Sequence, residues 1–194
     1  MRSIYKIVVC SLLTLSITSC EKDLLEKEQY QKEIYLIGAY NRVWTTEVSY
    51  SNEEVKTYFT VSSSGTLALD RDVNVKMKIN EELVDIYNKK YWTVLNEDKY
   101  YKSLDTDLYS IPSLENTVIK HAEGISAEVP VLIKTASLKI DQSYVIPVEI
   151  ESTTGYPISE SGYKMLILLK LKNDYSGSYQ MSGHTTLEGE TPKT

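Results

Sequence analysis

The sequence contains very little cysteine. Cys10 and Cys20 are the only two among 194 residues, and both lie close to the start of the chain. Two cysteines placed in this way cannot form the disulfide framework that holds many small secreted domains together. The fold must therefore depend on an ordinary hydrophobic core, and the chain is long enough for one core of normal domain size.

Histidine, glycine-rich loops and long apolar runs are also scarce. His121 and His184 are the only histidines, so a site with several histidine ligands is excluded by count. No glycine-rich phosphate loop and no nucleophile elbow is present. No apolar run approaches the about 18 residues of a membrane-spanning helix. We therefore predict neither a cofactor nor catalytic residues.

The first 20 residues have the features of an export signal. A short basic start precedes the apolar segment 7–17, which is too short to cross about 30 Å of hydrocarbon. The sequence ITSC at residues 17–20 then fits the bacterial lipoprotein signal, in which cleavage occurs before a cysteine that receives diacylglycerol. We expect residues 1–19 to be removed as a lipoprotein signal peptide. We expect Cys20 to be lipidated, so that the membrane is a partner of the mature chain.

Basic charge is in deficit. Removing residues 1–19 takes away two of the 21 basic residues and none of the 27 acidic ones, which changes the formal net charge from −6 to −8. A chain this acidic disfavours nucleic acid as a partner. Residues 20–32 are dominated by charge, and we expect them to form a lipidated, solvated tether, with a short helix as the alternative. Charge directly after a lipidated cysteine resembles the export signal of Bacteroidota surface lipoproteins, which implies an outer membrane lipoprotein exposed at the cell surface.

Past the tether, apolar residues recur at every second position, as in half-buried β-strands. Six segments show this alternation: 44–50, 55–61, 73–79, 125–133, 144–150 and 163–171. Pro130 and Pro147 fall on outward positions. Because proline cannot donate a hydrogen bond to a ladder, we expect these two prolines at sheet edges or bulges. The pattern places Val75, Met77, Val131, Ile146 and Ile167 in one core, and Lys76, Lys78, Glu149 and Lys170 in water.

One segment has helical spacing instead. Residues 80–91 read NEELVDIYNKKY, and Asn80 can cap a helix there. The apolar residues of this helix would share one face: Leu83, Ile86, Tyr87 and Tyr91. Many strands with one short helix predict an all-β antiparallel sandwich over residues 33–172. Residues 173–194 are polar and would form a tail or the truncated start of a second domain.

The helix and the strands that follow residue 130 carry a family resemblance. The sequence resembles the immunoglobulin-like N-terminal domain, formally of unknown function, of Bacteroidota polysaccharide-utilisation surface lipoproteins. That family shows an asparagine-led helix ending in Tyr-Asn, a strand reading Tyr-x-x-Pro, and a Ser-x-x-Gly turn. These features correspond here to residues 80–88, 144–147 and 152–155.

The resemblance implies an immunoglobulin-like antiparallel β-sandwich with one short helical insert. It also implies that the domain precedes another one, such as a glycoside hydrolase or a carbohydrate-binding sandwich. The shared motifs are structural rather than catalytic. We therefore predict a non-catalytic, lipid-anchored spacer or assembly domain of a cell-surface glycan-handling lipoprotein, with other glycan-utilisation proteins as possible partners.

Tyrosine is abundant, with 16 residues against a single phenylalanine. Tyrosine combines an apolar ring with a polar tip, which suits half-wet surfaces and sugar stacking. Trp92, Tyr100 and Tyr101 follow the predicted helix and are possible glycan-binding rings, so a glycan-binding module using aromatics in residues 92–109 is the alternative function. These rings would otherwise cover the end of the sandwich or pack the helix onto it.

Four oxygen-bearing residues match the spacing of a calcium-binding loop: Asp70, Asp72, Asn74 and Glu81. The glycine that such a loop needs at its sixth position is Val75 here. Residues 73–79 also alternate as a strand, which points their side chains to opposite faces. We therefore expect no metal site. Acidic pairs such as Glu53 and Glu54 are adjacent in sequence, which does not create the separation across a cleft that glycoside hydrolysis needs, so we predict no enzyme.

Overall fold

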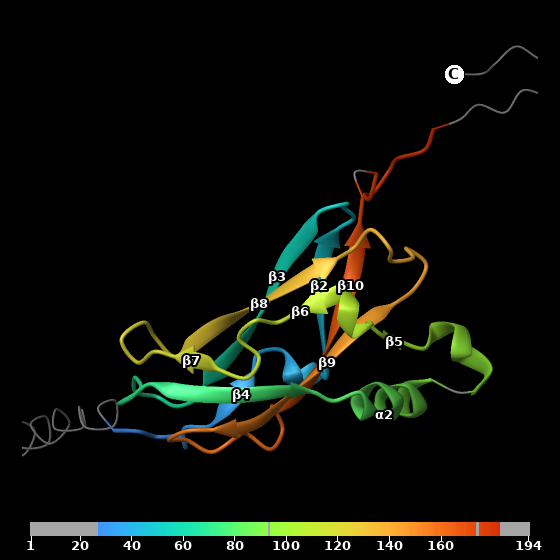
Figure 1. The fold of residues 1–194 in the computed structure, drawn as a ribbon. Coiled ribbons are helices and arrows are strands. Elements are labelled where there is room, and N and C mark those ends of the chain that lie inside the picture. Colours follow the sequence, from blue (N-terminus) through green and yellow to red (C-terminus); the bar gives the residue numbers. More distant parts are fainter. Residues whose placement is uncertain (1–26, 93, 174, 183–194) are drawn as a thin grey trace, which may run out of the picture.

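The computed structural model describes residues 27–92, 94–173 and 175–182, which form two packed β-sheets (Figure 1). The strands are β1 (Ile34–Leu36), β2 (Val43–Ser49), β3 (Glu54–Ser63), β4 (Val73–Ile79), β5 (Lys102–Ser103), β6 (Tyr109–Ser110), β7 (Thr117–Ile119), β8 (Ser126–Lys134), β9 (Tyr144–Thr153) and β10 (Lys164–Lys172). The helices are α2 (Glu82–Tyr91) and the short 3₁₀ helices η2 (Ala39–Asn41), η3 (Val94–Lys99) and η4 (Thr106–Leu108). The predicted all-β sandwich is confirmed.

The two sheets differ in size and in strand direction. One has the order β1-β3-β8-β6, and the other has the order β2-β10-β9-β4-β7 with β5 also paired to β9. Strand β10 runs parallel to β2, and β5 runs parallel to β9. The second sheet is therefore mixed rather than purely antiparallel as predicted. Alternation in a sequence shows which face of a strand is buried but not which way its neighbour runs.

The core lies between the sheets and is filled by the inward positions of the long strands. Val75, Met77, Val131, Ile146 and Ile167 are all at most 1% exposed, as the alternation predicts. Lys76, Lys78 and Lys170 are exposed, while Glu149 is half-buried. The predicted strand 44–50, which contains most of β2, departs from the pattern, because Trp44 and Tyr50 are 38% and 42% exposed. This strand is at the edge of its sheet, where fewer side chains cover it.

The two strand prolines have different environments. Pro130 is half-buried, between the buried Val129 and Val131. Strand β6 pairs with β8 only at Leu132 and Ile133, so the edge of β8 is unpaired by β6 at Pro130, as predicted for an outward edge position. Pro147 is buried in the central strand β9, so its predicted outward position is wrong. Its carbonyl accepts a hydrogen bond from the Asn80 N–H at 3.1 Å.

The bond from Asn80 explains why a central strand tolerates proline. In an antiparallel ladder the second bond of this pair would run from residue 147 N–H to the Asn80 carbonyl. Proline has no N–H, and the Asn80 carbonyl instead accepts from Leu83 N–H at 3.2 Å. Pro147 therefore lies where β4 ends and the chain turns into α2.

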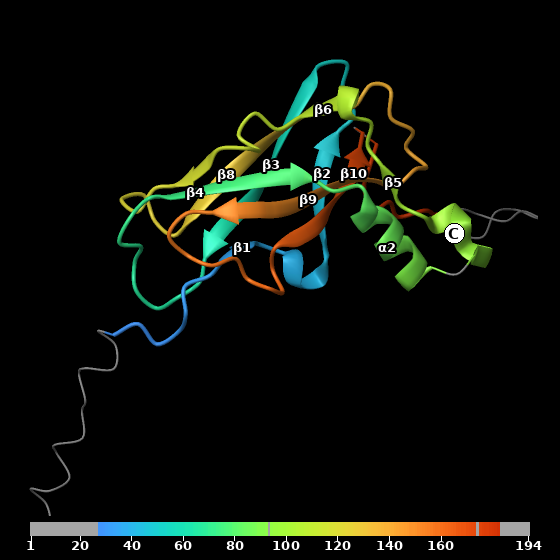
Figure 2. The same ribbon diagram turned by 60° about the horizontal axis from the view of Figure 1, so that its bottom comes forward.

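Helix α2 packs on the outer face of β9 and β10, at one end of the larger sheet (Figure 2). Asn80 has its predicted capping role, because its Oδ1 accepts from the Glu82 N–H at 3.2 Å. The predicted apolar face is wrong in part. Ile86 and Tyr91 are 53% and 49% exposed, whereas Leu83, Val84 and Asn88 are buried.

Asn88 is the reason for this difference. Its amide donates to the Tyr101 carbonyl and accepts from the Tyr101 N–H, both at 2.9 Å. A buried amide with both of these bonds can occupy the inner face of a helix. A hydrophobicity pattern places such a residue on the solvent side. The face predicted to be buried is therefore turned away from the face that is buried in the structure.

Several predictions concern residues outside the described ranges: the signal peptide 1–19, the lipidation of Cys20 and the first part of the tether. Across the described ranges, no helix combines the length and apolarity that crossing a membrane requires.

Candidate functional site

The three predicted glycan-binding rings do not form a free, exposed set. Trp92, Tyr100 and Tyr101 are each half-buried. The Tyr101 ring stacks on Tyr87 of α2, with centroids 5.2 Å apart and planes 11° apart. The Lys99 ammonium lies 5.7 Å from the centre of the Trp92 ring. Tyr101 therefore packs the helix against the chain that follows it, which is the alternative role stated for these rings.

Burial raises the pKa of Tyr87 to about 12, and the neighbouring Tyr101 hydroxyl adds to this effect. The Tyr87 hydroxyl therefore stays protonated at any physiological pH. It is a polar group at the edge of the helix contact and close to a pocket.

A pocket of about 280 Å³ lies beside α2, η2 and the start of β10. Met165 and Leu166 contribute buried apolar surface to it. One wall is a stripe of α2 with the i, i+3, i+4, i+7 spacing of a single helix face: Leu83, Ile86, Tyr87 and Lys90. The exposed Ile86 is thus a pocket residue rather than a core residue. The helical spacing correctly put Leu83, Ile86 and Tyr87 on one face but gave no sign that this face lines a pocket.

The opposite wall comes from chain segments that are remote from α2 in sequence. Tyr40 and Arg42 belong to η2 and the residue that follows it, and Glu160 and Lys164 belong to the β9–β10 loop and the start of β10. No pattern in the sequence connects these positions. The packing of β10 between β2 and β9 brings them together.

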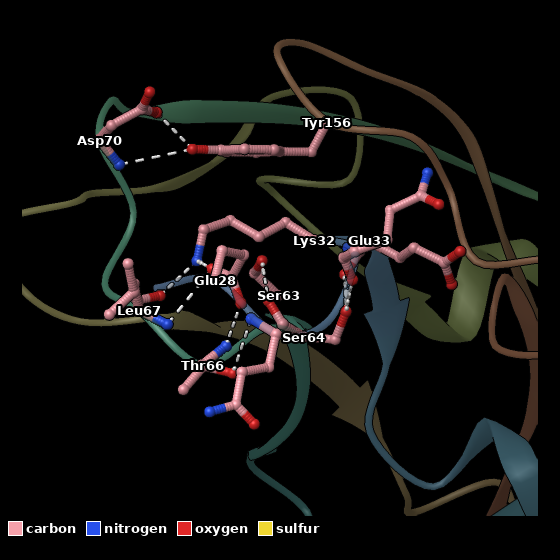
Figure 3. A network of polar contacts seen from close by, with 11 residues as sticks. Glu28, Lys32, Glu33, Ser63, Ser64, Thr66, Leu67, Asp70 and Tyr156 are labelled. Carbon is pink, nitrogen blue, oxygen red and sulfur yellow. Dashed lines mark hydrogen bonds and ion pairs between the residues drawn. The ribbon is translucent and has the colours of Figure 1, made fainter. Parts of the chain in front are cut away.

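A separate polar network holds the N-terminal segment against the sandwich (Figure 3). The Glu28 carboxylate accepts hydrogen bonds from the backbone N–H groups of Thr66 and Leu67 and pairs with Lys32. Lys32 also donates to the Leu67 carbonyl. Ser64 Oγ accepts from the Glu33 N–H at 2.9 Å. Residues 28–33 are therefore attached to the β3–β4 loop rather than solvated on all sides.

The same loop is tied to the β9–β10 loop. The Tyr156 hydroxyl donates to the Asp70 carboxylate, which also forms two hydrogen bonds with the Arg71 guanidinium at 2.9 and 3.0 Å. Arg71, and then Tyr156, hold the pKa of Asp70 far below its usual range. We call the contacts of Glu28, Lys32, Ser64, Asp70 and Tyr156 the N-terminal clamp.

The N-terminal clamp should weaken in acid. The bond from Lys32, followed by that from the Thr66 amide, lowers the pKa of Glu28 from 4.5 to about 2. Since the folded pKa is depressed, the stabilisation by Glu28 is complete above pH 4.5, decreases as the pH falls below 4.5, and is absent below about pH 2. We expect the amide-proton chemical shift of Thr66 to titrate with a midpoint near pH 2, measured by NMR.

A Glu28→Gln variant removes the titrating group and should abolish this transition. Glu33→Gln is the matched control, because Glu33 takes part in the network through its backbone N–H and carbonyl and not through its carboxylate. A Thr66 transition that survives Glu28→Gln would show that another group causes it.

Two of the four residues that match calcium-loop spacing, Asp70 and Asp72, have partners within the domain. Asp72 Oδ1 accepts from the His121 N–H at 2.9 Å and lies 2.6 Å from His121 Nδ1, and Asp70 is bound to Arg71 and Tyr156. Within the part of the chain that the structure describes, no three His, Cys, Asp or Glu side chains are grouped so that they could hold a metal ion.

Comparison with known families gives two matches along the chain. A family model described as an N-terminal domain matches residues 30–157, and a model described as a C-terminal domain matches residues 163–194. The chain belongs to the first of these families. The boundary between the two matches falls in the β9–β10 loop, so β10 completes the sheet of the N-terminal domain although it lies in the second match.

Solved structures from Bacteroides ovatus share the fold of this N-terminal domain. A protein of unknown function has a TM-score of 0.61 at 20% identity, covering 85% of this chain and 55% of its own. A multidomain protein that includes a domain of unknown function has a TM-score of 0.58 at 22% identity, with coverages of 79% and 49%. A putative carbohydrate binding protein has a TM-score of 0.55 at 19% identity, with coverages of 71% and 36%.

The chain thus spans about half or less of the length of these solved proteins. No curated protein matches it significantly.

Proposed function

We propose that this chain is a non-catalytic, lipid-anchored spacer or assembly domain of a cell-surface glycan-handling lipoprotein. The observation that supports this role most directly is the placement of the two ends of the folded domain. The N-terminal clamp includes Tyr156 of the β9–β10 loop, and the Ile34 N–H donates to the Pro157 carbonyl in the same loop. The chain enters the domain near the start of β10 and leaves it at the other end, at Lys172 (Figure 1).

The distance between entry and exit is the length of a strand. Strand β10 contains nine residues, which at about 3.3 Å per residue extend about 30 Å. The chain that arrives from Cys20 and any domain after β10 would therefore join the sandwich at opposite ends. This geometry suits a spacer.

The names of the solved relatives support a role in glycan handling. Besides the putative carbohydrate binding protein, they include an auxiliary nutrient binding protein and an endoglycosidase with a Man5GlcNAc product, both from Bacteroides thetaiotaomicron. This chain covers only 47% and 30% of the last two proteins. Their activities are not assigned to the shared domain. Two sequence features also support the proposal. The family resemblance implies an immunoglobulin-like domain, and the sequence ITSC fits a lipoprotein signal.

Lipidation is tested by labelling a Bacteroides host that expresses the full chain with a radioactive fatty acid. We expect the wild-type chain to take up label and Cys20→Ala to take up none, because Cys20 is the only thiol after the signal. Cys10→Ala is the matched control and should label normally. Equal labelling of Cys20→Ala and wild type, or none in either, would refute the anchor.

The non-catalytic role is tested on the same purified chain. We expect no release of reducing sugar from plant, host or microbial polysaccharides. Hydrolysis that co-purifies with the chain through several columns would contradict the spacer proposal and would leave the anchor result unaffected.

A further inference from the structure

Three basic side chains line the pocket beside α2. Elsewhere on the domain several lysines lie against carboxylates, as in Lys76 with Glu151, Lys120 with Glu123, and Lys172 with Glu47. Arg42, Lys90 and Lys164 all line the pocket, and among the described residues none of the three forms an ion pair with a carboxylate. In a chain with a formal net charge of −6, such a cluster is a local reversal of charge.

Two of these cations lie beside tyrosine rings. The Lys164 ammonium lies 4.8 Å from the centre of the Tyr163 ring, and the Lys90 ammonium lies 5.3 Å from that of Tyr91. A ring attracts a cation but does not neutralise its charge. Both ammonium groups therefore remain available to an anion, and Glu160 is the one acidic residue that lines the pocket.

The backbone at Arg42 is held in an unusual conformation. Its φ is +63°, and it is the one non-glycine residue in the described ranges with positive φ. Two hydrogen bonds of 2.8 Å fix it, from its N–H to the Ala39 carbonyl and from the Leu166 N–H to its own carbonyl. Left-handed backbone at a non-glycine residue is strained and tends to occur at functional sites. Here it fixes a guanidinium-bearing residue at the rim of the pocket.

The pocket also has exposed apolar surface. Tyr40 is 89% exposed and Ile86 is 53% exposed, and both line it together with Tyr87. Ligand pockets are mainly apolar with a few well-placed polar groups, and a volume of about 280 Å³ suits a short ligand. A sugar ring has an apolar face that stacks on tyrosine and hydroxyls that bond to its polar tip.

We propose that this pocket binds an acidic sugar, meaning a glycan unit that carries a carboxylate or a sulfate. Arg42, Lys90 and Lys164 would hold the anionic group, with Arg42 able to bind it through two N–H groups. Tyr40 would cover the sugar face. This site goes beyond the spacer function and does not depend on it, and it does not include Trp92, Tyr100 or Tyr101.

An acidic peptide is disfavoured by the backbone around the pocket. Extended peptides commonly bind by adding a strand to a free sheet edge. At the pocket, β10 is already paired on both sides, with β9 and with β2. Strand β10, which lines the pocket, therefore offers no open edge to a peptide.

The test is a titration of the purified full chain with four named probes, followed by isothermal calorimetry. Trigalacturonic acid carries carboxylates, a heparin disaccharide carries sulfates, chitotriose is neutral, and a short polyglutamate peptide is acidic but not a sugar. We expect binding of one or both acidic sugars, weakened at 0.5 M salt since exposed charges are screened. We expect neither chitotriose nor polyglutamate to bind comparably.

Two adjacent lysines on α2 provide a matched pair. Lys90 lines the pocket and Lys89 does not, although both are exposed on the same helix. Lys90→Gln should weaken binding of the acidic sugar by about tenfold, as for loss of one charge-assisted hydrogen bond. Lys89→Gln should change it by less than about twofold, which is the size of a long-range charge effect. Both variants should melt at the wild-type temperature.

Tyr40→Ala gives a second, uncharged test and should weaken the same binding several-fold. The proposal is overturned if no acidic sugar binds at millimolar concentration, if chitotriose binds equally, if polyglutamate binds better than both acidic sugars, or if Lys89→Gln and Lys90→Gln lose affinity equally. Each of these outcomes leaves the fatty-acid labelling of Cys20 unaffected, so failure of this site and failure of the spacer proposal can be distinguished.

Discussion

Replacing Phe59 by alanine should lower the free energy of unfolding by about 3–5 kcal/mol, the usual cost of truncating a fully buried phenylalanine. Phe59 is the only phenylalanine in the sequence and is 1% exposed in the middle of β3, facing the core between the sheets. Its removal leaves a cavity that the paired strands around it cannot close. Denaturation by urea, monitored by circular dichroism, measures the loss.

Tyr58→Ala is the control for this prediction. Tyr58 is the preceding residue of the same strand, and its ring is 43% exposed on the other face. Because a strand alternates its side chains, the control should lose less than about 1 kcal/mol, a value typical of surface contacts. Equal losses in the two variants would mean that β3 has the wrong face toward the core.

Replacing Asn88 by alanine should have the second largest effect. The change removes both partners of the Tyr101 backbone, whose N–H and carbonyl then remain partly buried without hydrogen bonds. Each buried unsatisfied group costs about 1–3 kcal/mol, and partial burial favours the lower end, so we expect a total loss of about 2–3 kcal/mol. Urea denaturation measures this loss.

Hydrogen exchange adds a local readout for Asn88. The Tyr101 amide should exchange much faster in Asn88→Ala, while the amides of β4 keep their protection. Lys89→Ala is the control, since it changes the adjacent exposed position of the same helix and should leave both measurements unchanged. A stable Asn88→Ala protein with a protected Tyr101 amide would show that these two bonds do not hold α2 to the following segment.

The sequence predicted the long strands well because each of them carries its own period. Residues 73–79 alternate Val, Val, Met and Ile with Asn and Lys, and β4 has these same bounds in the structure. The short strands β1, β5, β6 and β7 have two or three residues each, which is too few to show a period. The parallel pairing of β2 with β10 joins distant parts of the chain and leaves no local signal.

The candidate site was harder to predict for the same reason. Its walls come from residues 39–42, 83–90 and 160–166, which only the assembled sheet brings together. One signal was present in the sequence, since Lys90 continues the stripe of Leu83, Ile86 and Tyr87. We predicted Leu83, Ile86 and Tyr87 as one apolar helix face, and such faces usually pack against the rest of a domain. Hydrophobicity does not distinguish Asn88, which holds the helix in its actual rotation, from a surface amide, and the Tyr-Asn motif of the family resemblance marks its position without giving its role.

The placement of β10 also determines how the domain would respond to mechanical force. A pull between the N-terminal clamp and the exit at Lys172 acts along β10, because these two points lie near the opposite ends of this strand. The hydrogen bonds that join β10 to β2 and β9 run across the strand, so such a load shears many of them together rather than breaking them one after another. We therefore expect β10 to resist a pull along its own direction better than a pull across it.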